Sequence, residues 1–213
     1  GFYSFSDKDG FGKETFYPSS QEEIVFRHLV NISFCHPSVI IRNKAIDGLM
    51  FNTGYPHAED YELFERISSL YPVANLNTIG ISYRIHESSV SSQHRETQLL
   101  GKQKIQERAW ARFNLKASSS NVCLIEALLN QDYSRIDLVL LEGVLTDLLN
   151  EKSILSIPPT TWNNWCSLIG RYWYHACRNQ SNFIAYSQSA LSKHYRLTSI
   201  EKLTFITKSF FKK

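Results

Sequence analysis

Two short segments of this chain carry residue types suited to acid–base and metal chemistry. Glu59 and Asp60 are adjacent carboxylates at the start of a predicted helix, within Tyr55–Leu63. Arg84 and His86 follow about twenty residues later. They lie two positions apart in a predicted strand, so their side chains share one of its faces. Paired carboxylates beside a histidine and an arginine suit a metal-assisted group-transfer site.

The carboxylate pair has two interpretations. As a general base, Asp60 has to be ionised, which the positive end of the helix dipole favours and the adjacent Glu59 opposes. As helix caps, the two residues need no further role, because Asp and Glu are common in the first turn of helices. From these residues alone, capping is the commoner outcome, and both interpretations stay open.

The histidine and the arginine also have two interpretations. His86 can coordinate Mn²⁺ or Mg²⁺ beside carboxylates, and Arg84 can bind a diphosphate through two parallel hydrogen bonds. Alternatively, His86 is a surface histidine at the end of a strand, before a serine-rich turn. His36, which precedes Pro37 and Ser38, either lines a cleft or caps a turn.

Periodicity predicts the elements that position these residues. We expect residues 1–20 to form a loop, followed by a short helix capped by Ser20. The β-branched run Val39–Ile41 predicts a buried strand. A helical period covers residues 58–70, and a period of two covers residues 79–86.

The remainder of the chain is expected to be helical. Its predicted helices span residues 94–113, 121–130, 134–151, 161–178, 182–196 and 199–211. The predicted fold class is therefore an α/β piece over residues 1–92 followed by a mainly α-helical module over residues 93–213.

Composition narrows the classes of function. Hydrophobic residues make up 43% of the 213 residues and charged residues 20%, as in globular proteins. Residues 1–92 hold 7 Lys and Arg against 11 Asp and Glu, whereas residues 93–213 hold 16 against 9. The basic half suits a phosphate-bearing acceptor or an anionic membrane surface. Alternatively, its charged residues simply lie on the solvent-exposed faces of helices. No basic–aromatic pattern of a nucleic-acid module is present.

Two features of the helical half also have two interpretations. Aromatic residues recur at helical spacing in Trp162–Tyr174 and form either a sugar-stacking platform or a helix–helix core. The final segment, with Leu203, Ile206 and Phe210 among lysines, either docks on a membrane surface or packs against its neighbours. The four cysteines have no metal-site or redox-motif spacing, which favours free thiols in a reducing cytoplasm.

The order of four motifs resembles the C-terminal half of family 2 glycosyltransferases. His36-Pro37-Ser38-Val39 is followed by Tyr55–Leu63, which reads YPHAEDYEL, then by Asn75-Leu76 and by Tyr83–Ser91, which reads YRIHESSVS. The resemblance covers residues 18–92, under half of the chain. It implies the C-terminal part of a GT-A domain with a helical extension.

The resemblance also implies a reaction and a set of roles. The reaction is inverting transfer of a sugar from a nucleotide-sugar to the hydroxyl of a glycan or lipid-linked glycan, in bacterial polysaccharide biosynthesis at the cell envelope. Asp60 matches the catalytic base, and His86 matches a ligand of the divalent metal, Mn²⁺ or Mg²⁺. The implied substrate-binding residues are Glu59, Arg84, His36, Ser38, Ser88 and Ser91.

The sequence departs from the family pattern in its first half. The nucleotide-binding βαβ units and their DxD motif do not precede the matched region, and Asp7-Lys8-Asp9 lies too close to the first helix to replace them. We therefore expect this chain alone to be inactive and to hold the metal only in the complete enzyme. The expected location is either the cytoplasm or, through peripheral contact of the basic C-terminal helix, the inner face of the plasma membrane. The alternative function is a non-catalytic helical module that binds a partner or a membrane.

Overall fold

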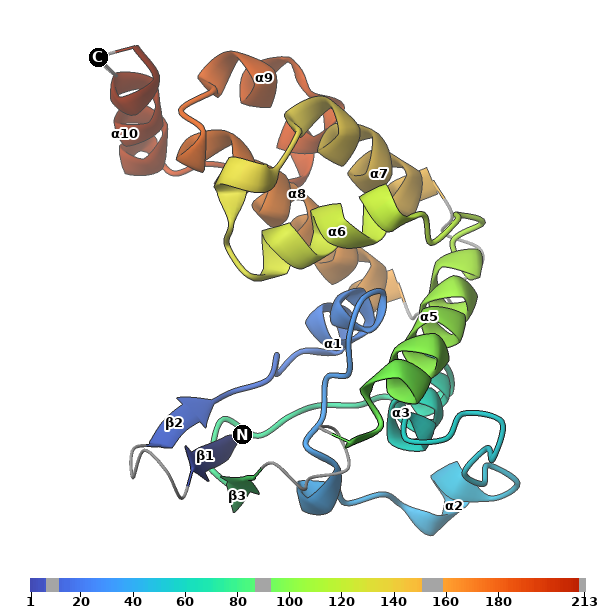
Figure 1. Ribbon diagram of the computed structural model, residues 1–213. Helices are drawn as coiled ribbons and strands as arrows, with labels where there is room; N and C mark the ends of the chain where they lie inside the picture. The colour runs from blue at the N-terminus through green and yellow to red at the C-terminus, as the bar shows by residue number, and fades with distance from the viewer. Residues whose placement is uncertain (7–11, 87–92, 151–158, 211–213) are drawn as a thin grey trace. The chain divides into compact units, whose positions relative to one another are not determined.

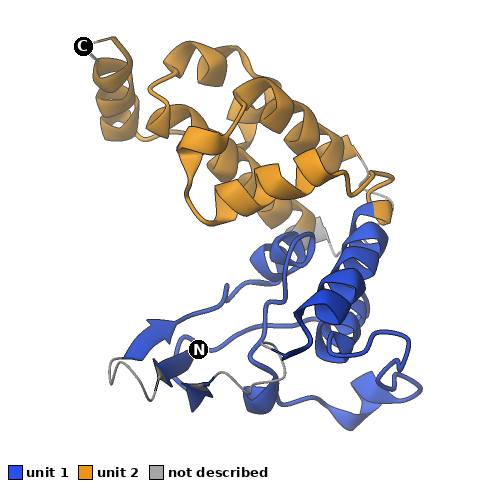
Figure 2. Ribbon diagram, viewed as in Figure 1, with its two compact units in different colours: residues 1–110 blue, residues 111–213 orange. Residues whose placement is uncertain are grey.

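The computed structural model describes residues 1–6, 12–86, 93–150 and 159–210. The described chain is mixed α/β, mostly helical, with a small three-stranded sheet. It forms two compact units, Gly1–Trp110 and Ala111–Lys213 (Figures 1 and 2). The broad α/β and helical composition agrees with the predicted fold class, and each unit is considered by itself below.

The sheet of the first unit joins two segments that are far apart in its sequence. Strand β1 (Phe2–Ser6) lies between β2 (Gly12–Thr15), which is antiparallel to it, and β3 (Ile81–Ile85), which is parallel to it. The expectation of a loop over residues 1–20 was therefore wrong for these two segments. The β1–β3 pairing joins residues distant in sequence, which local periodicity cannot indicate.

Three helices form the body of the first unit. They are α1 (Gln21–His28), α3 (Glu59–Leu70) and α5 (Arg95–Ala111) (Figure 1). Ser20 caps α1 as predicted, because its Oγ accepts a hydrogen bond from the N–H of Glu23 at 3.3 Å. The periodicity of residues 58–70 also predicted α3 correctly.

The predicted buried strand at Val39–Ile41 is absent from the described structure. His36–Ser38 forms a 3₁₀ turn, and a short helix, α2 (Asn43–Ile46), follows soon after. Val39 has an extended backbone, but none of the described strands pairs with it, and Ile40 is 99% exposed. The β-branched pattern was correct about local conformation and wrong about burial, which depends on a neighbouring strand.

Helix α5 belongs to the first unit, although the sequence analysis placed it in the helical module after residue 92. Its Gln106 side chain donates to the carbonyl oxygen of Val30 at 2.8 Å. Its Trp110 indole N–H donates to the carbonyl oxygen of Leu29, also at 2.8 Å. Both bonds are buried, so they fix α5 against the segment that follows α1.

The second unit is built from helices. They are α6 (Ser119–Leu129), α7 (Leu138–Asn150), α8 (Pro159–Asn179), α9 (Phe183–Gln188) and α10 (Ser199–Phe210). Each predicted helix of this region has a counterpart, but the one expected at 182–196 divides at Ser189, whose extended backbone separates α9 from a 3₁₀ turn, Ala190–His194.

The aromatic residues of α8 contribute to the core of the second unit. Trp165, Trp173 and Tyr174 are buried, and the rings of Phe113 and Trp165 stack with centroids 5.5 Å apart. The Trp165 indole N–H donates to the carbonyl oxygen of Leu148 at 3.2 Å. These contacts decide between the two interpretations of Trp162–Tyr174 in favour of helix packing for the three buried residues.

Candidate active site

A cleft of about 690 Å³ opens in the first unit, beside the start of α3. Its walls come from β1, β3, the segment between α1 and α2, and the first turns of α5. Volumes of this size are typical of small-molecule sites. The cleft therefore joins four parts of the sequence around the N-terminal end of one helix.

Asp60 is the carboxylate that lines this cleft. Its side chain is 31% exposed, and its Oδ2 lies 3.8 Å from Nδ1 of His36, which also lines the cleft. Its Oδ1 accepts a hydrogen bond from the backbone N–H of Tyr61 at 2.7 Å. The structure thus brings together two of the residues that the sequence singled out.

Burial raises the pKa of Asp60 above its usual range. The Tyr61 N–H and His36 act in the opposite direction, and the neighbouring Glu59 adds to the rise. A raised pKa makes a carboxylate a better proton acceptor, provided that it is ionised at the working pH. This carboxylate is therefore partly buried, lines the cleft and has a raised pKa.

Aromatic side chains form a second wall. The ring of Phe2 lies 6.0 Å from that of Tyr17 and 5.8 Å from that of Tyr83, measured between centroids, and all three residues line the cleft. Burial raises the pKa of Tyr17, so its hydroxyl stays protonated at neutral pH. Such rings offer apolar faces to the C–H groups of a ligand and, through tyrosine, hydrogen-bonding edges.

Helix α5 supplies the cations of the cleft. Arg95, Gln98 and Lys102 line it from successive turns of this helix. The Gln98 amide donates to the carbonyl oxygen of His57 at 2.9 Å, which ties α5 to the segment before α3. A Cβ atom at Gly101 would lie 2.9 Å from the Cβ of Ala58, so the glycine permits this close approach.

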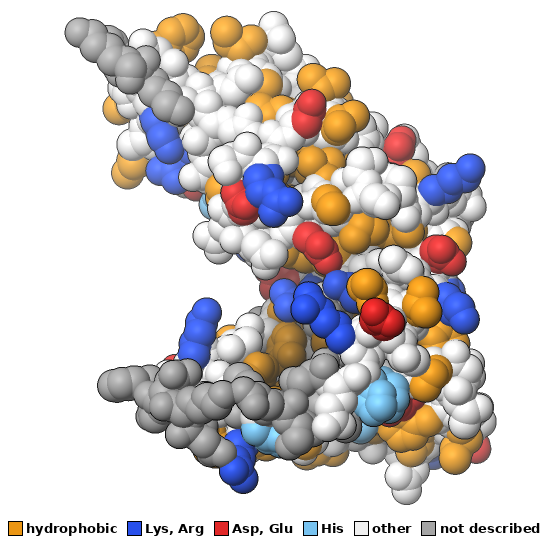
Figure 3. Space-filling model, viewed as in Figure 1, with side chains coloured by type: hydrophobic (Ala, Val, Ile, Leu, Met, Phe, Trp, Pro, Cys, Tyr) orange, Lys and Arg blue, Asp and Glu red, His pale blue; other side chains and the backbone are white. Residues whose placement is uncertain are grey.

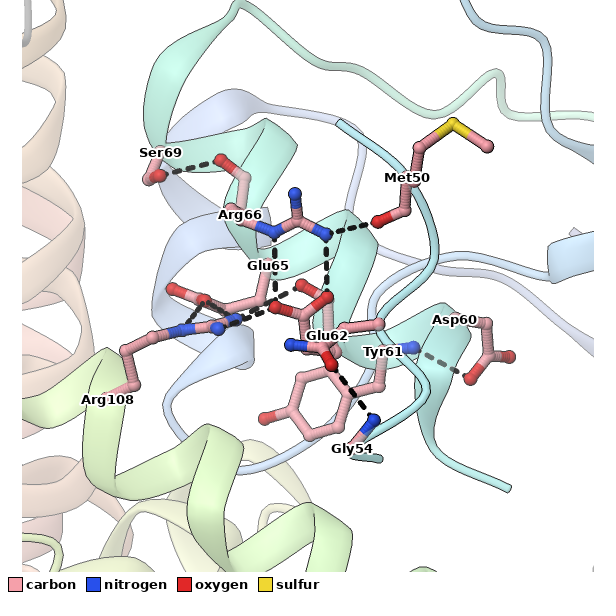
Figure 4. A network of polar contacts seen from close by, with 10 residues as sticks. Met50, Gly54, Asp60, Tyr61, Glu62, Glu65, Arg66, Ser69 and Arg108 are labelled. Carbon is pink, nitrogen blue, oxygen red and sulfur yellow. Dashed lines mark hydrogen bonds and ion pairs between the residues drawn. The ribbon is translucent and has the colours of Figure 1, made fainter. Parts of the chain in front are cut away.

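A network of buried ion pairs holds α5 against α3 (Figure 4). Arg108 of α5 contacts a Glu62 oxygen at 2.6 Å and a Glu65 oxygen at 2.6 Å, and Arg66 contacts the other Glu62 oxygen at 2.8 Å. The Glu62 and Glu65 side chains are 1% and 4% exposed. Asp60 carries no dashed contact to these groups in Figure 4, where its one marked partner is Tyr61.

The other predicted site residues lie apart from this cleft. Glu59 is outside its lining, and its Oε2 is buried with no hydrogen-bond partner among the described residues. Ser38 lines a separate, more apolar groove of about 680 Å³ and donates to the carbonyl oxygen of Cys35 at 2.9 Å. Arg84 and His86 are exposed, and neither belongs to the described lining of the cleft.

Two predicted residues and one motif cannot be placed. Ser88 and Ser91 lie outside the described residues, as does Asp7-Lys8-Asp9. Within the part of the chain that the structure describes, no group of three or more His, Cys, Asp or Glu side chains is arranged to hold a metal ion. His86 alone does not form a metal site.

Sequence reasoning missed several residues of the cleft. Tyr83 directly precedes Arg84 on β3 and lies on the opposite face of the strand from Arg84 and His86. Phe2 lies in a segment expected to be loop, and Arg95 and Lys102 belong to a helix assigned to another module. The signal available for Tyr83 was the same period of two that was used for Arg84 and His86.

Comparison with protein-family models, with curated proteins and with solved structures finds no match to this chain.

Proposed function

We propose that the first unit supplies the base and the acceptor side of an inverting sugar transferase of the family 2 type, with Asp60 as the base. One observation carries the proposal: a carboxylate of raised pKa opens into a ligand-sized cleft between aromatic and cationic side chains. The order of the four sequence motifs supports the same assignment. The GT-A fold and the sugar-transfer reaction are parts of this proposal.

The proposed chemistry is a single displacement at the anomeric carbon of the donor sugar. Asp60 accepts the proton of the acceptor hydroxyl while that oxygen forms a bond to the anomeric carbon. The bond from the anomeric carbon to the diphosphate breaks on the opposite side, and the nucleoside diphosphate leaves with the bonding electrons. The raised pKa of Asp60 favours acceptance of the proton.

His36 is proposed to position the base. At 3.8 Å its Nδ1 is slightly beyond hydrogen-bond distance of Asp60 Oδ2, and such distances often shorten when a ligand binds. In its protonated form His36 favours the carboxylate form of Asp60, in keeping with its lowering effect on that pKa. His36 therefore acts through Asp60 in this proposal.

The walls of the cleft suit a sugar and an anionic group. Tyr83, Tyr17 and Phe2 offer ring faces to the C–H groups of a sugar, while Arg95 and Lys102 offer charge to a phosphate or carboxylate. Both features favour a glycan acceptor or donor over a purely apolar ligand. The divalent ion belongs to the proposal for the complete enzyme, in which the resemblance assigns His86 to it, and no step is assigned to it here.

Asp60→Asn in the complete gene product tests the base. The assay measures release of nucleoside diphosphate from a panel of nucleotide-sugars, with simple glycans as acceptors. Because the amide cannot take the proton, we expect kcat to fall by about 10²–10⁴-fold. Asp47→Asn is the matched control, since Asp47 is an exposed carboxylate at the end of α2, outside the lining of the cleft. Loss of less than about threefold in Asp60→Asn would refute the assignment.

A binding experiment tests the cleft in the chain of 213 residues. Saturation-transfer NMR with a panel of methyl glycosides should show contact of sugar C–H protons with the protein, and Tyr83→Ala should weaken it because one ring face is removed. Tyr133→Ala, in the second unit, is the matched control. Equal signals from the two variants, or no signal from any glycoside, would count against a sugar site in this cleft.

A further inference from the structure

Helix α10 of the second unit carries apolar residues on two opposite sides. On the inner side, Phe205 is fully buried, and its ring lies 5.7 Å from Tyr174, 5.3 Å from Phe183 and 5.7 Å from Tyr186. These aromatic contacts attach the helix to α8 and α9. Phe205 therefore packs against the neighbouring helices, as one of the two interpretations of the C-terminal segment expects.

The outer side of α10 remains exposed. Ile200 is 76% exposed, Leu203 is 64% exposed and Phe210 is 64% exposed. Their spacing of three and seven residues places them on one stripe of the helix, which lies away from the direction of Phe205. We call these three residues the outer stripe. Exposed large apolar side chains in a row on one helix are typical of an interaction surface.

Basic residues accompany the outer stripe. Lys202 and Lys208 are exposed and lie on either side of it around the helix. Figure 3 shows hydrophobic and Lys or Arg side chains next to each other over this helix. The neighbouring acid, Glu201, is engaged in the helix cap, where it accepts hydrogen bonds from the backbone N–H of Thr198 at 2.8 Å and from the hydroxyl of Tyr195 at 3.1 Å.

The surrounding sequence is strongly basic. From residue 159 onward Glu201 is the single acidic residue, and the basic residues are Arg171, Arg178, Lys193, Arg196, Lys202, Lys208, Lys212 and Lys213. Such a charge distribution attracts an anionic surface and repels a second copy of itself. The positive charge therefore favours an anionic surface over a second copy of the chain as the partner of the outer stripe.

We propose that α10 docks on an anionic lipid surface, with its axis parallel to the membrane and the outer stripe inserted among the lipids. The apolar side chains enter the boundary between headgroups and acyl chains, while Lys202 and Lys208 contact lipid phosphates. The 12 residues of α10 extend about 18 Å along the surface. None of the described helices is long and apolar enough to cross a membrane, so the contact proposed is peripheral.

Vesicle co-sedimentation of the chain of 213 residues tests this contact. The probes are vesicles of phosphatidylcholine alone and of phosphatidylcholine with 30% phosphatidylglycerol. We expect binding to the anionic vesicles, reduced by salt, and little binding to the neutral ones. Leu203→Asp and Phe210→Asp should each weaken binding by about tenfold or more, because a charge replaces an inserted apolar side chain.

Matched controls separate the stripe from general hydrophobicity. Leu140→Asp changes an exposed leucine on α7 of the same unit, 56% exposed, and should leave vesicle binding within about twofold of the unchanged chain. Lys202→Gln with Lys208→Gln should reduce the preference for anionic vesicles, because two of the eight basic residues of this region are removed. Circular dichroism checks that each variant keeps its helix content.

Three outcomes would overturn the proposal. They are equal binding to neutral and anionic vesicles, equal binding of Leu203→Asp and Leu140→Asp, and no binding to either vesicle. In the last case, a dimer that light scattering detects and that Leu203→Asp dissociates would assign the outer stripe to a second copy of the chain. The proposal stands apart from the sugar-transfer function, because none of these measurements involves Asp60 or the cleft.

Discussion

Helix α3 carries acidic side chains toward two different environments. Glu62 and Glu65 are almost fully buried and are bonded to arginines (Figure 4), whereas Asp60, at the start of the same helix, lines the cleft. Burial opposes the ionisation of both Glu62 and Asp60. In Glu62 the hydrogen bonds from Arg66 and Arg108 outweigh burial and lower the pKa, whereas in Asp60 burial prevails and the pKa rises.

This contrast separates a structural carboxylate from one available for chemistry. The buried pair is satisfied by cations of the protein itself and joins α3 to α5. Asp60, by contrast, lines the cleft. Its carboxylate lies 3.8 Å from the His36 ring nitrogen and accepts a hydrogen bond from the backbone N–H of Tyr61. Perturbed carboxylates in a cleft are candidates for function, while equally perturbed ones in an ion-pair network are not.

The largest effect expected from this comparison is that of Arg108→Met. The change removes the Arg108 contacts to both Glu62 and Glu65, whose side chains are 1% and 4% exposed. We expect the first unit to lose about 3–5 kcal/mol of stability. Hydrogen exchange of the peptide that covers α3, followed in urea, measures this unit separately from the second. Arg135→Met, at an exposed arginine, should change nothing measurable.

A smaller effect is expected for Glu62→Gln. The amide keeps an oxygen for one arginine but loses the charge, which should cost about 1–3 kcal/mol at pH 7. Because the folded pKa of Glu62 lies below its unfolded value, the stabilisation is complete above the unfolded pKa and is lost as the pH falls through the folded pKa. The variant should therefore lose less stability on acidification than the unchanged chain. If the free energy of unfolding had the same pH dependence in both proteins, Glu62 would not be a stabilising ionised carboxylate.

The smallest effect, with the opposite sign, is expected for the stability of Asp60→Asn. Because the folded pKa of Asp60 lies above its unfolded value, ionisation destabilises the fold as the pH rises through this interval. The amide removes that contribution, so the variant should equal or exceed the unchanged chain at pH 7 by on the order of a few tenths of a kcal/mol. A clear loss of stability would place Asp60 with the structural carboxylates.

Much of this arrangement could be predicted from local sequence. The apolar spacing at Leu63, Phe64, Ile67 and Leu70 predicted α3, and the Ser20 capping signal marked the start of α1 correctly. The predicted position of Asp60 at a helix start is confirmed. In each case, the determining interactions lie within a few residues of one another.

Features that depend on distant residues could not be predicted. The pattern at Val39–Ile41 indicates an extended segment, but whether a strand covers it is decided elsewhere in the protein. Similarly, the pairing of Phe2 with Ile81 and the approach of Lys102 to the cleft depend on packing across the unit. The assignment of Asp60 as a base remains a prediction, because the residues around it define a cleft and do not identify a substrate.

The central position of β1 in its sheet has a consequence for folding during synthesis. The β1–β2 pair can form early, but an isolated pair of strands is at best marginally stable in water. Its parallel partner β3 ends at Ile85, which at about 5–20 residues per second leaves the ribosome roughly 4–16 s after Ser6. The cleft is lined by Phe2 of β1 and Tyr83 of β3. It can therefore form only after α1 and α3 have been synthesised.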